Sequence, residues 1–227
     1  MIDHIFSYLQ TDIPSLKACS EAHPLYSSLA ERHIYARIVS KSGCCNDILE
    51  NPRLLYYPRT LEIRFTRKPL VISIISLIPR MANLVSLKIF QPCPFNRRLE
   101  FFSTLRNCLQ QSSLQELHLF NIIYGVPFSF LDDARSIKQL ALFDCVVDKD
   151  DPISTSPSSQ LSLDSLILSS DYDSYLHRWV TRWVTRLTSL ELRDVSVDHD
   201  WTAGPELLVA CSNSLTKLHL DVANLCM

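Results

Sequence analysis

A short pattern that recurs seven times constrains the fold of this chain more than any other feature. The six later copies share an apolar residue, two variable residues, a leucine, one variable residue and an aliphatic residue, and the first keeps only the last part. The copies are TLEIRF, LVSLKIF, LQELHLF, IKQLALF, LDSLILS, LTSLELR and LTKLHLD. Their central leucines are Leu61, Leu87, Leu117, Leu140, Leu166, Leu190 and Leu218, at intervals of 26, 30, 23, 26, 24 and 28 residues. Such near-regular order indicates a repeat architecture.

The alternation of leucine with a variable residue is typical of a strand with one apolar face. Between the copies, the pattern changes to helical or extended segments, as in 97–111, 174–189 and 205–213. One strand and one returning segment cannot bury their own leucines, so neighbouring repeats must stack and share a core. The sequence therefore predicts an α/β solenoid of about seven parallel strands, with the leucines from Leu87 to Leu218 all buried on one side.

The first 40 residues have a different, helical pattern. Ile2, Ile5, Phe6 and Leu9 have the spacing of one helical face. Asp12 can cap a second helix, and a third follows the break at 23–24. We expect a helical unit at 1–42, with no strand in 2–38, followed by the solenoid at 43–227. Three such helices bury too little surface to be stable alone, so they need a partner or the rest of the chain.

Both parts resemble known families. The repeats resemble the leucine-rich repeat, and IKQLALFDC and LLVACSNSLTKL resemble its cysteine-containing variety, with Cys211 ending a return helix. IDHIFSYLQTDIPSLKACSEAHPLYSSLAERHIYARI resembles an F-box of the fungal type. The Leu-Pro element with which this family usually starts is not present ahead of Ile2, so we expect the chain to begin inside the F-box.

The resemblance implies a function without catalysis. The chain would be the substrate-receptor subunit of an SCF-type cullin–RING ubiquitin ligase, in which the helices dock a Skp-family adaptor and the repeats hold a target protein. The implied adaptor-binding residues are Ile2, Ile5, Phe6, Leu9, Ile13, Pro14 and Leu16. The alternative is a stand-alone leucine-rich-repeat scaffold whose N-terminal helices only cap the open end of the solenoid.

The residue after each Leu-x-Leu unit points to the other face of the strand, which is the concave face of the expected solenoid. In three consecutive repeats this residue is phenylalanine, and charged residues and histidine share the face. The predicted partner-binding residues are Lys88, Phe90, His118, Phe120, Phe143, Glu191 and Arg193. An exposed aromatic row predicts a surface for a protein partner. The alternative is that returning loops cover it.

Composition excludes several other classes. A net charge of -2 gives no basic field for nucleic acid, and the longest apolar run, 69–79, is too short to span a membrane. Three glycines are too few for a phosphate-binding loop, so no cofactor is expected. We interpret the eight cysteines as reduced thiols in the cytoplasm or nucleus rather than as disulfides. The acidic runs at 147–151 and 197–201 are interpreted as solvated turns rather than metal sites.

Overall fold

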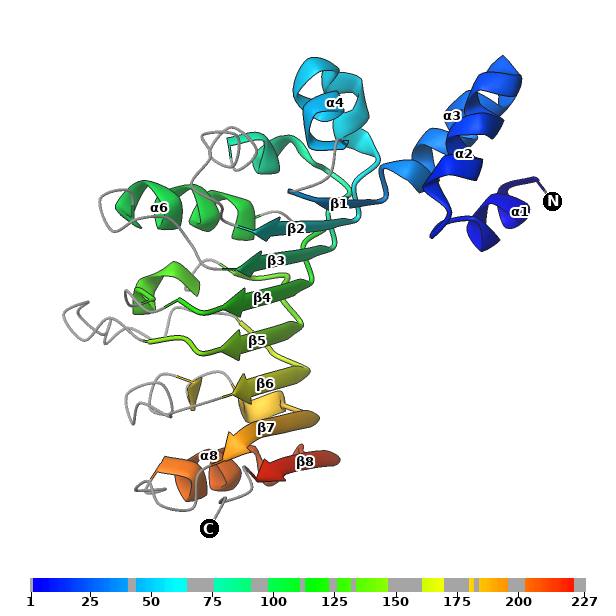
Figure 1. The fold of residues 1–227 in the computed structure, drawn as a ribbon. Helices are drawn as coiled ribbons and strands as arrows, with labels where there is room; N and C mark the ends of the chain where they lie inside the picture. The colour runs from blue at the N-terminus through cyan, green and yellow to red at the C-terminus, as the bar shows by residue number, and fades with distance from the viewer. Residues whose placement is uncertain are drawn as a thin grey trace, which may run out of the picture.

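The computed structural model has an α/β fold with one eight-stranded sheet (Figure 1). The residues described are 2–40, 44–64, 76–90, 98–110, 113–122, 126–131, 134–146, 161–169, 180–181, 184–195 and 203–222. All neighbouring strands are parallel, and their order in the sheet is their order in the chain. This arrangement is compatible with the predicted repeat solenoid.

The strands coincide with the sequence repeats, and one further strand precedes them. They are β1 (Arg37–Val39), β2 (Thr60–Arg64), β3 (Ser86–Phe90), β4 (Glu116–Phe120), β5 (Gln139–Phe143), β6 (Ser165–Ser169), β7 (Ser189–Val195) and β8 (Lys217–Val222). The register aligns the central leucines of successive repeats, from Leu61 to Leu218, as the sequence predicts.

A backbone hydrogen-bond pattern recurs between successive strands. The carbonyl two residues before the central aliphatic residue accepts two N–H groups from the next repeat, as Val85 O does from Gln115 and Glu116, each at 2.9 Å. The acceptors are Ala36, Arg59, Val85, Gln115, Lys138, Asp164 and Thr188. These bonds connect the backbone at the point where each strand begins, so the first residues of neighbouring strands are aligned in the sheet.

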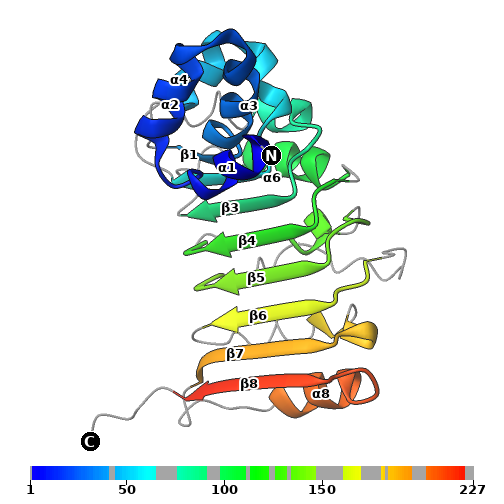
Figure 2. The same cartoon turned by 90° about the vertical axis from the view of Figure 1, so that its right-hand side faces the viewer.

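The core lies on one face of this sheet. From β2 to β7 the leucines of the repeats are buried there together with side chains of the returning segments, such as Phe101 and Leu105. These segments are η2 (Ile78–Arg80), α6 (Arg98–Leu109), η4 (Phe128–Leu131), η5 (Val184–Arg186) and α8 (Ala203–Cys211). Figures 1 and 2 show that α6 and α8 lie on the same side of the sheet, so its other face is left uncovered by them.

The end of the core next to β1 is closed by α4 (Cys44–Glu50) and η1 (Pro52–Tyr56). Ile48, Leu54 and Leu55 from these two elements are buried in the main core. The opposite end is different, because Leu218 of β8 is 48% exposed. The prediction that Leu218 is buried with the other leucines is therefore wrong. In the described part of the chain no strand follows β8, so nothing described packs against the outer side of this leucine.

The N-terminal helices α1 (Ile2–Tyr8), α2 (Ile13–Ala22) and α3 (Pro24–Ile34), here called the helical unit, pack together around a separate small core. Asp12 caps α2 as expected, since the carboxylate of Asp12 accepts two hydrogen bonds from Ser15. The backbone N–H of Ser15 donates at 3.2 Å, and the hydroxyl of Ser15 donates at 2.6 Å. The break before α3 is also confirmed, because His23 has an extended backbone.

Two expectations for the N-terminal region are corrected. Residues 37 and 38 were expected to be helical, but they belong to β1, which pairs with β2. The sheet consequently has eight strands rather than about seven. The expected returning segments at 97–111 and 205–213 overlap α6 and α8, and half of 174–189 lies outside the described residues.

Candidate interaction surfaces

The face of the sheet opposite α6 and α8 carries a stack of three aromatic rings, here called the phenylalanine ladder. Phe90, Phe120 and Phe143 occupy the same register position on β3, β4 and β5. The centroids of Phe90 and Phe120 are 4.1 Å apart with planes at 4°, and those of Phe120 and Phe143 are 4.5 Å apart at 1°. Parallel strands impose this spacing, because identical positions of neighbouring strands lie about 4.8 Å apart.

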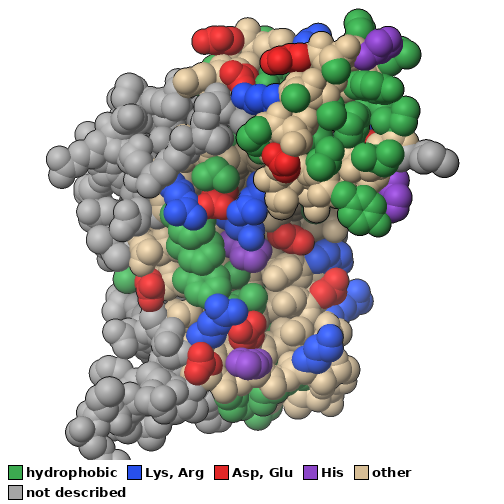
Figure 3. Space-filling model, turned by 45° about the vertical axis from the view of Figure 1, so that its right-hand side comes forward, with side chains coloured by type: hydrophobic (Ala, Val, Ile, Leu, Met, Phe, Trp, Pro, Cys, Tyr) green, Lys and Arg blue, Asp and Glu red, His purple; other side chains and the backbone are tan. Residues whose placement is uncertain are grey.

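Each end of the ladder carries an arginine. The guanidinium carbon of Arg64 lies 5.0 Å from the centre of the Phe90 ring, and that of Arg193 lies 5.4 Å from the centre of the Phe143 ring. Both distances are within the range of cation–π attraction. In Figure 3 a hydrophobic band runs down this face between patches of Lys and Arg, as expected for this order of side chains.

Each of these arginines forms a charged hydrogen bond with a glutamate on its own strand. Arg64 Nε donates to Glu62 at 2.5 Å, and Arg193 Nε donates to Glu191 at 2.6 Å. Glu62 also accepts a hydrogen bond from Arg37 of β1 at 3.2 Å. Burial disfavours the charge of Glu62, but the hydrogen bonds from Arg64 and Arg37 outweigh it and hold its pKa below the ordinary value.

The three ladder rings are half-buried, so neither alternative from the sequence describes them fully. The rings shield each other face to face, and the arginines shield the two ends. What remains accessible is therefore an aromatic strip rather than three separate rings. Exposed aromatic area next to arginine is typical of the central contacts in protein interfaces.

Beside the ladder, the residue between the two aliphatic positions of each strand forms a second row on the same face. The register aligns its members as Glu62, Lys88, His118, Ala141, Ile167, Glu191 and His219. Burial and the nearby charge of Lys88 lower the pKa of His118, against an opposing effect of Glu116. The imidazole is therefore neutral near pH 7. Its Nε2 and the hydroxyl of Ser86 are buried without a hydrogen-bond partner within the described part of the chain.

The helical unit forms a second candidate surface. Its core contains Phe6, Leu16, Ala30 and Ile34, and apolar side chains remain outside this core. Ile5 is 53% exposed, Tyr8 76% and Leu25 73%, and Ile2 and Tyr26 are also exposed. Figures 1 and 3 show this unit projecting from the β1 end of the sheet with hydrophobic side chains at its surface.

The predicted adaptor-binding residues divide between surface and core. Ile2, Ile5 and Pro14 are exposed, and Leu9 and Ile13 are half-buried. Phe6 and Leu16 are buried, so the expectation that these two side chains belong to the adaptor-binding surface is wrong for the isolated chain. The ring of Phe6 packs edge-on against Tyr26 and His33, which come from α3.

Sequence reasoning did not include Tyr8, Leu25 and Tyr26 of the helical unit or Arg64 of the sheet among the site residues. Ile2, Ile5 and Tyr8 are three residues apart, so they lie along one side of α1, which is exposed. Phe6 lies on the inner side, which faces the small core. On the sheet, the pattern Glu-x-Arg occurs in the same register in LEIRF and LELRD. That shared pattern was the signal for Arg64.

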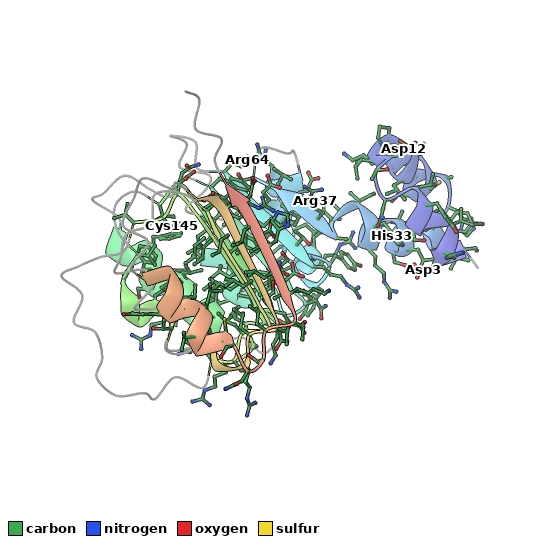
Figure 4. All side chains as sticks on the ribbon, turned by 90° about the horizontal axis from the view of Figure 1, so that it is seen from below. Asp3, Asp12, His33, Arg37, Arg64 and Cys145 are labelled. Carbon is green, nitrogen blue, oxygen red and sulfur yellow. The ribbon has the colours of Figure 1, made fainter. Side chains whose placement is uncertain are left out.

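Contacts between the helical unit and the sheet region are both apolar and polar. Tyr35, which directly follows α3, packs against the small core and against the main core. Arg53 of η1 pairs with Glu31 of α3 at 3.0 Å, and the hydroxyl of Tyr35 donates to Asp47 of α4 at 3.1 Å. Figure 4 shows Asp3 and His33 together in the helical unit, where they pair at 3.1 Å. In the same view Arg37 and Arg64 lie toward the helical unit, and Cys145 lies on the covered side of the sheet.

The described cysteines are buried or half-buried, and no described cluster could hold a metal ion. Cys19, Cys108, Cys145 and Cys211 are free thiols, and burial raises the pKa of Cys108 and of Cys145 to about 12. Within the described ranges, no group of His, Cys, Asp or Glu could hold a metal ion, and no helix is long and apolar enough to cross a membrane. The acidic runs at 147–151 and 197–201 lie outside those ranges, as do the side chains of the other four cysteines.

Comparisons with known proteins add no name to these features. No family model matches the chain, and no curated protein has a significantly similar sequence.

Proposed function

We propose that this chain is a substrate receptor of an SCF-type cullin–RING ubiquitin ligase, with an F-box-like helical unit and a leucine-rich-repeat solenoid. The observation that carries the proposal is the separate core of the helical unit, combined with the exposure of Ile5, Tyr8 and Leu25 outside it. Exposed apolar area of this kind is typical of a docking surface. The partner would be a Skp-family adaptor, which links the receptor to the cullin.

The phenylalanine ladder is the proposed site for the target protein. Aromatic rings and arginines supply most of the binding free energy in many protein interfaces. The receptor would act by raising the effective concentration of the target near the ligase, with no bond made or broken by this chain.

A stand-alone interaction scaffold is the second candidate. The contacts Arg53–Glu31 and Tyr35–Asp47 favour it, because they tie the helical unit to the end of the sheet. Against a pure capping role, the apolar end of the main core is already covered by α4 and η1 through Ile48, Leu54 and Leu55.

Binding of a purified Skp-family adaptor, measured by calorimetry, tests the first candidate. The substitution Ile5→Asp should abolish binding, because it places a charge in the exposed apolar face. The matched control is Val146→Asp, which makes the same kind of change at an exposed valine after β5 and should bind like the unmodified chain. Absence of binding by the unmodified chain would reject the receptor proposal in favour of the scaffold.

A further inference from the structure

The end of the sheet at β8 differs from its interior. Leu218 and Leu220 are 48% and 47% exposed, whereas the equivalent leucines of β7, Leu190 and Leu192, are buried. Val209 of α8 is also exposed at this end. Within the described sheet β8 is an edge strand, and such strands are templates for pairing with another chain.

The backbone of β8 determines which residues can pair outward. The N–H of Lys217 donates to Thr188 O, so Lys217 directs its backbone groups toward β7. The backbone N–H and C=O groups of successive residues point alternately to the two sides of a strand. Those of His219 and Asp221 therefore also point toward β7, and those of Leu218 and Leu220 point away from it. A partner strand must therefore bond to the backbone of the two leucines.

The side chains of β8 are self-complementary in one antiparallel register. If two copies meet with His219 on the twofold axis, Leu218 of each copy lies opposite Leu220 of the other and exchanges both hydrogen bonds with it. Lys217 then lies opposite Asp221 at a position without backbone hydrogen bonds, where Cα atoms are about 4.5 Å apart. Opposite charges face each other twice, and the leucines of both copies lie on the same face of one continuous sheet.

We propose that this chain forms a twofold homodimer through antiparallel pairing of β8, centred on His219. The occupant of the open edge is thus a second copy of the same chain. A shift of two residues in one direction places Lys217 opposite His219, and a shift in the other leaves Lys217 outside the strand pair. Of these three registers, the one centred on His219 therefore places Lys217 of each copy opposite Asp221 of the other.

The test is the mass of the protein in solution, measured by sedimentation equilibrium over a range of concentrations. The monomer has a mass of 26.0 kDa, so the dimer is expected at about 52 kDa. Lys217→Asp alone and Asp221→Lys alone each place like charges opposite one another twice and should raise the dimer dissociation constant at least about tenfold. Combining the two substitutions restores both pairs and should restore the dimer.

The control is Lys138→Asp, which makes the same change at an exposed lysine next to β5, in the interior of the sheet, and should leave the dimer intact. Far-UV circular dichroism of each variant establishes that the chain is folded. A protein that stays at 26.0 kDa at every concentration overturns the proposal. So does a dimer that is insensitive to both single substitutions, because a different surface would then hold it together.

Discussion

Interior strands of the sheet and helices of the helical unit bury their apolar residues in different ways. In the sheet, Leu117 is covered by strands on both sides and by returning segments, inside a core that runs continuously from α4 to α8. In the helical unit, Phe6 and Leu16 belong to a core of four buried residues, and Ile5 and Tyr8 remain outside it. The side of the sheet that faces the core buries its apolar residues except at β8, whereas the helical unit leaves Ile5 and Tyr8 available to a partner.

The largest effect is expected in the interior of the sheet. Leu117→Ala should lower the free energy of unfolding by about 2–5 kcal/mol, because it leaves a cavity among rigid neighbours. The matched substitution Leu218→Ala should cost about 1 kcal/mol or less, since half of this side chain is already exposed. Urea unfolding followed by circular dichroism measures both. Equal losses would show that the end of the sheet is as well covered as its interior.

The second prediction concerns the independence of the helical unit. Leu16→Ala should destabilise that unit by about 2–4 kcal/mol, because Leu16 is fully buried in its small core. Hydrogen exchange should show lost protection in α2 and α3 and unchanged protection in β4. A parallel loss in β4 would mean that the helices support the sheet, as the capping role requires.

The third prediction concerns the end of the sheet next to the helical unit, where Arg37 of β1 contacts Glu62 of β2. Glu62→Gln should lower stability at pH 7 by about 1–3 kcal/mol, because two charged hydrogen bonds are weakened. Glu191→Gln, the matched change at the other end of the ladder, should cost less. The side chain of Glu191 is 26% exposed against 4% for Glu62, so water screens its pairing with Arg193 more strongly.

The effect of Glu62→Gln should also depend on pH. The pKa of Glu62 is lower in the folded chain than its ordinary 4.5. Its contribution to stability is therefore fully present above pH 4.5 and is lost as the pH falls below that value through the folded pKa. Denaturation curves at several pH values should show the two proteins converging in acid. A constant difference would assign the loss to packing rather than charge.

The smallest effect is expected for the ladder. Phe120→Ala removes a half-buried ring from a stack that solvent already reaches, so the melting temperature should fall by only about 2–4 °C. Thermal unfolding without any partner measures this. A much larger fall would mean that the ring belongs to the core, which would contradict its proposed role in target binding.

Sequence reasoning predicted the register of the sheet because a leucine pair in each repeat fixes both the face and the alignment of a strand. It missed β1, where Ile38 is the only buried aliphatic residue of a strand of three. It also treated Leu218 like the other leucines, since a local pattern contains no information on whether another strand packs beside it. The open end became visible only in three dimensions.

The candidate surfaces were predicted in part. The row of phenylalanines follows directly from the register, and the structure confirms it at Phe90, Phe120 and Phe143. The arginines at its ends depend on side chains that reach across from neighbouring strands, as Arg193 does over Ser169 to Phe143. In α1 the apolar spacing alone did not separate the side chains that face solvent from those that face the small core. Phe6 lies in that core because α3 packs against it.

The order of the strands has a consequence for how the chain is made. Each strand pairs with the one that precedes it in the sequence, at an interval of 23 to 30 residues between the leucine-centred repeats, so contacts close only short loops. On the ribosome, each repeat can therefore dock on the previous one as soon as it emerges. At every step the newest strand has the open backbone and half-covered leucines that β8 has in the structure. During synthesis the newest strand thus keeps an open edge until the next repeat has been translated. In this interval the growing chain is most vulnerable to pairing with a strand of another molecule.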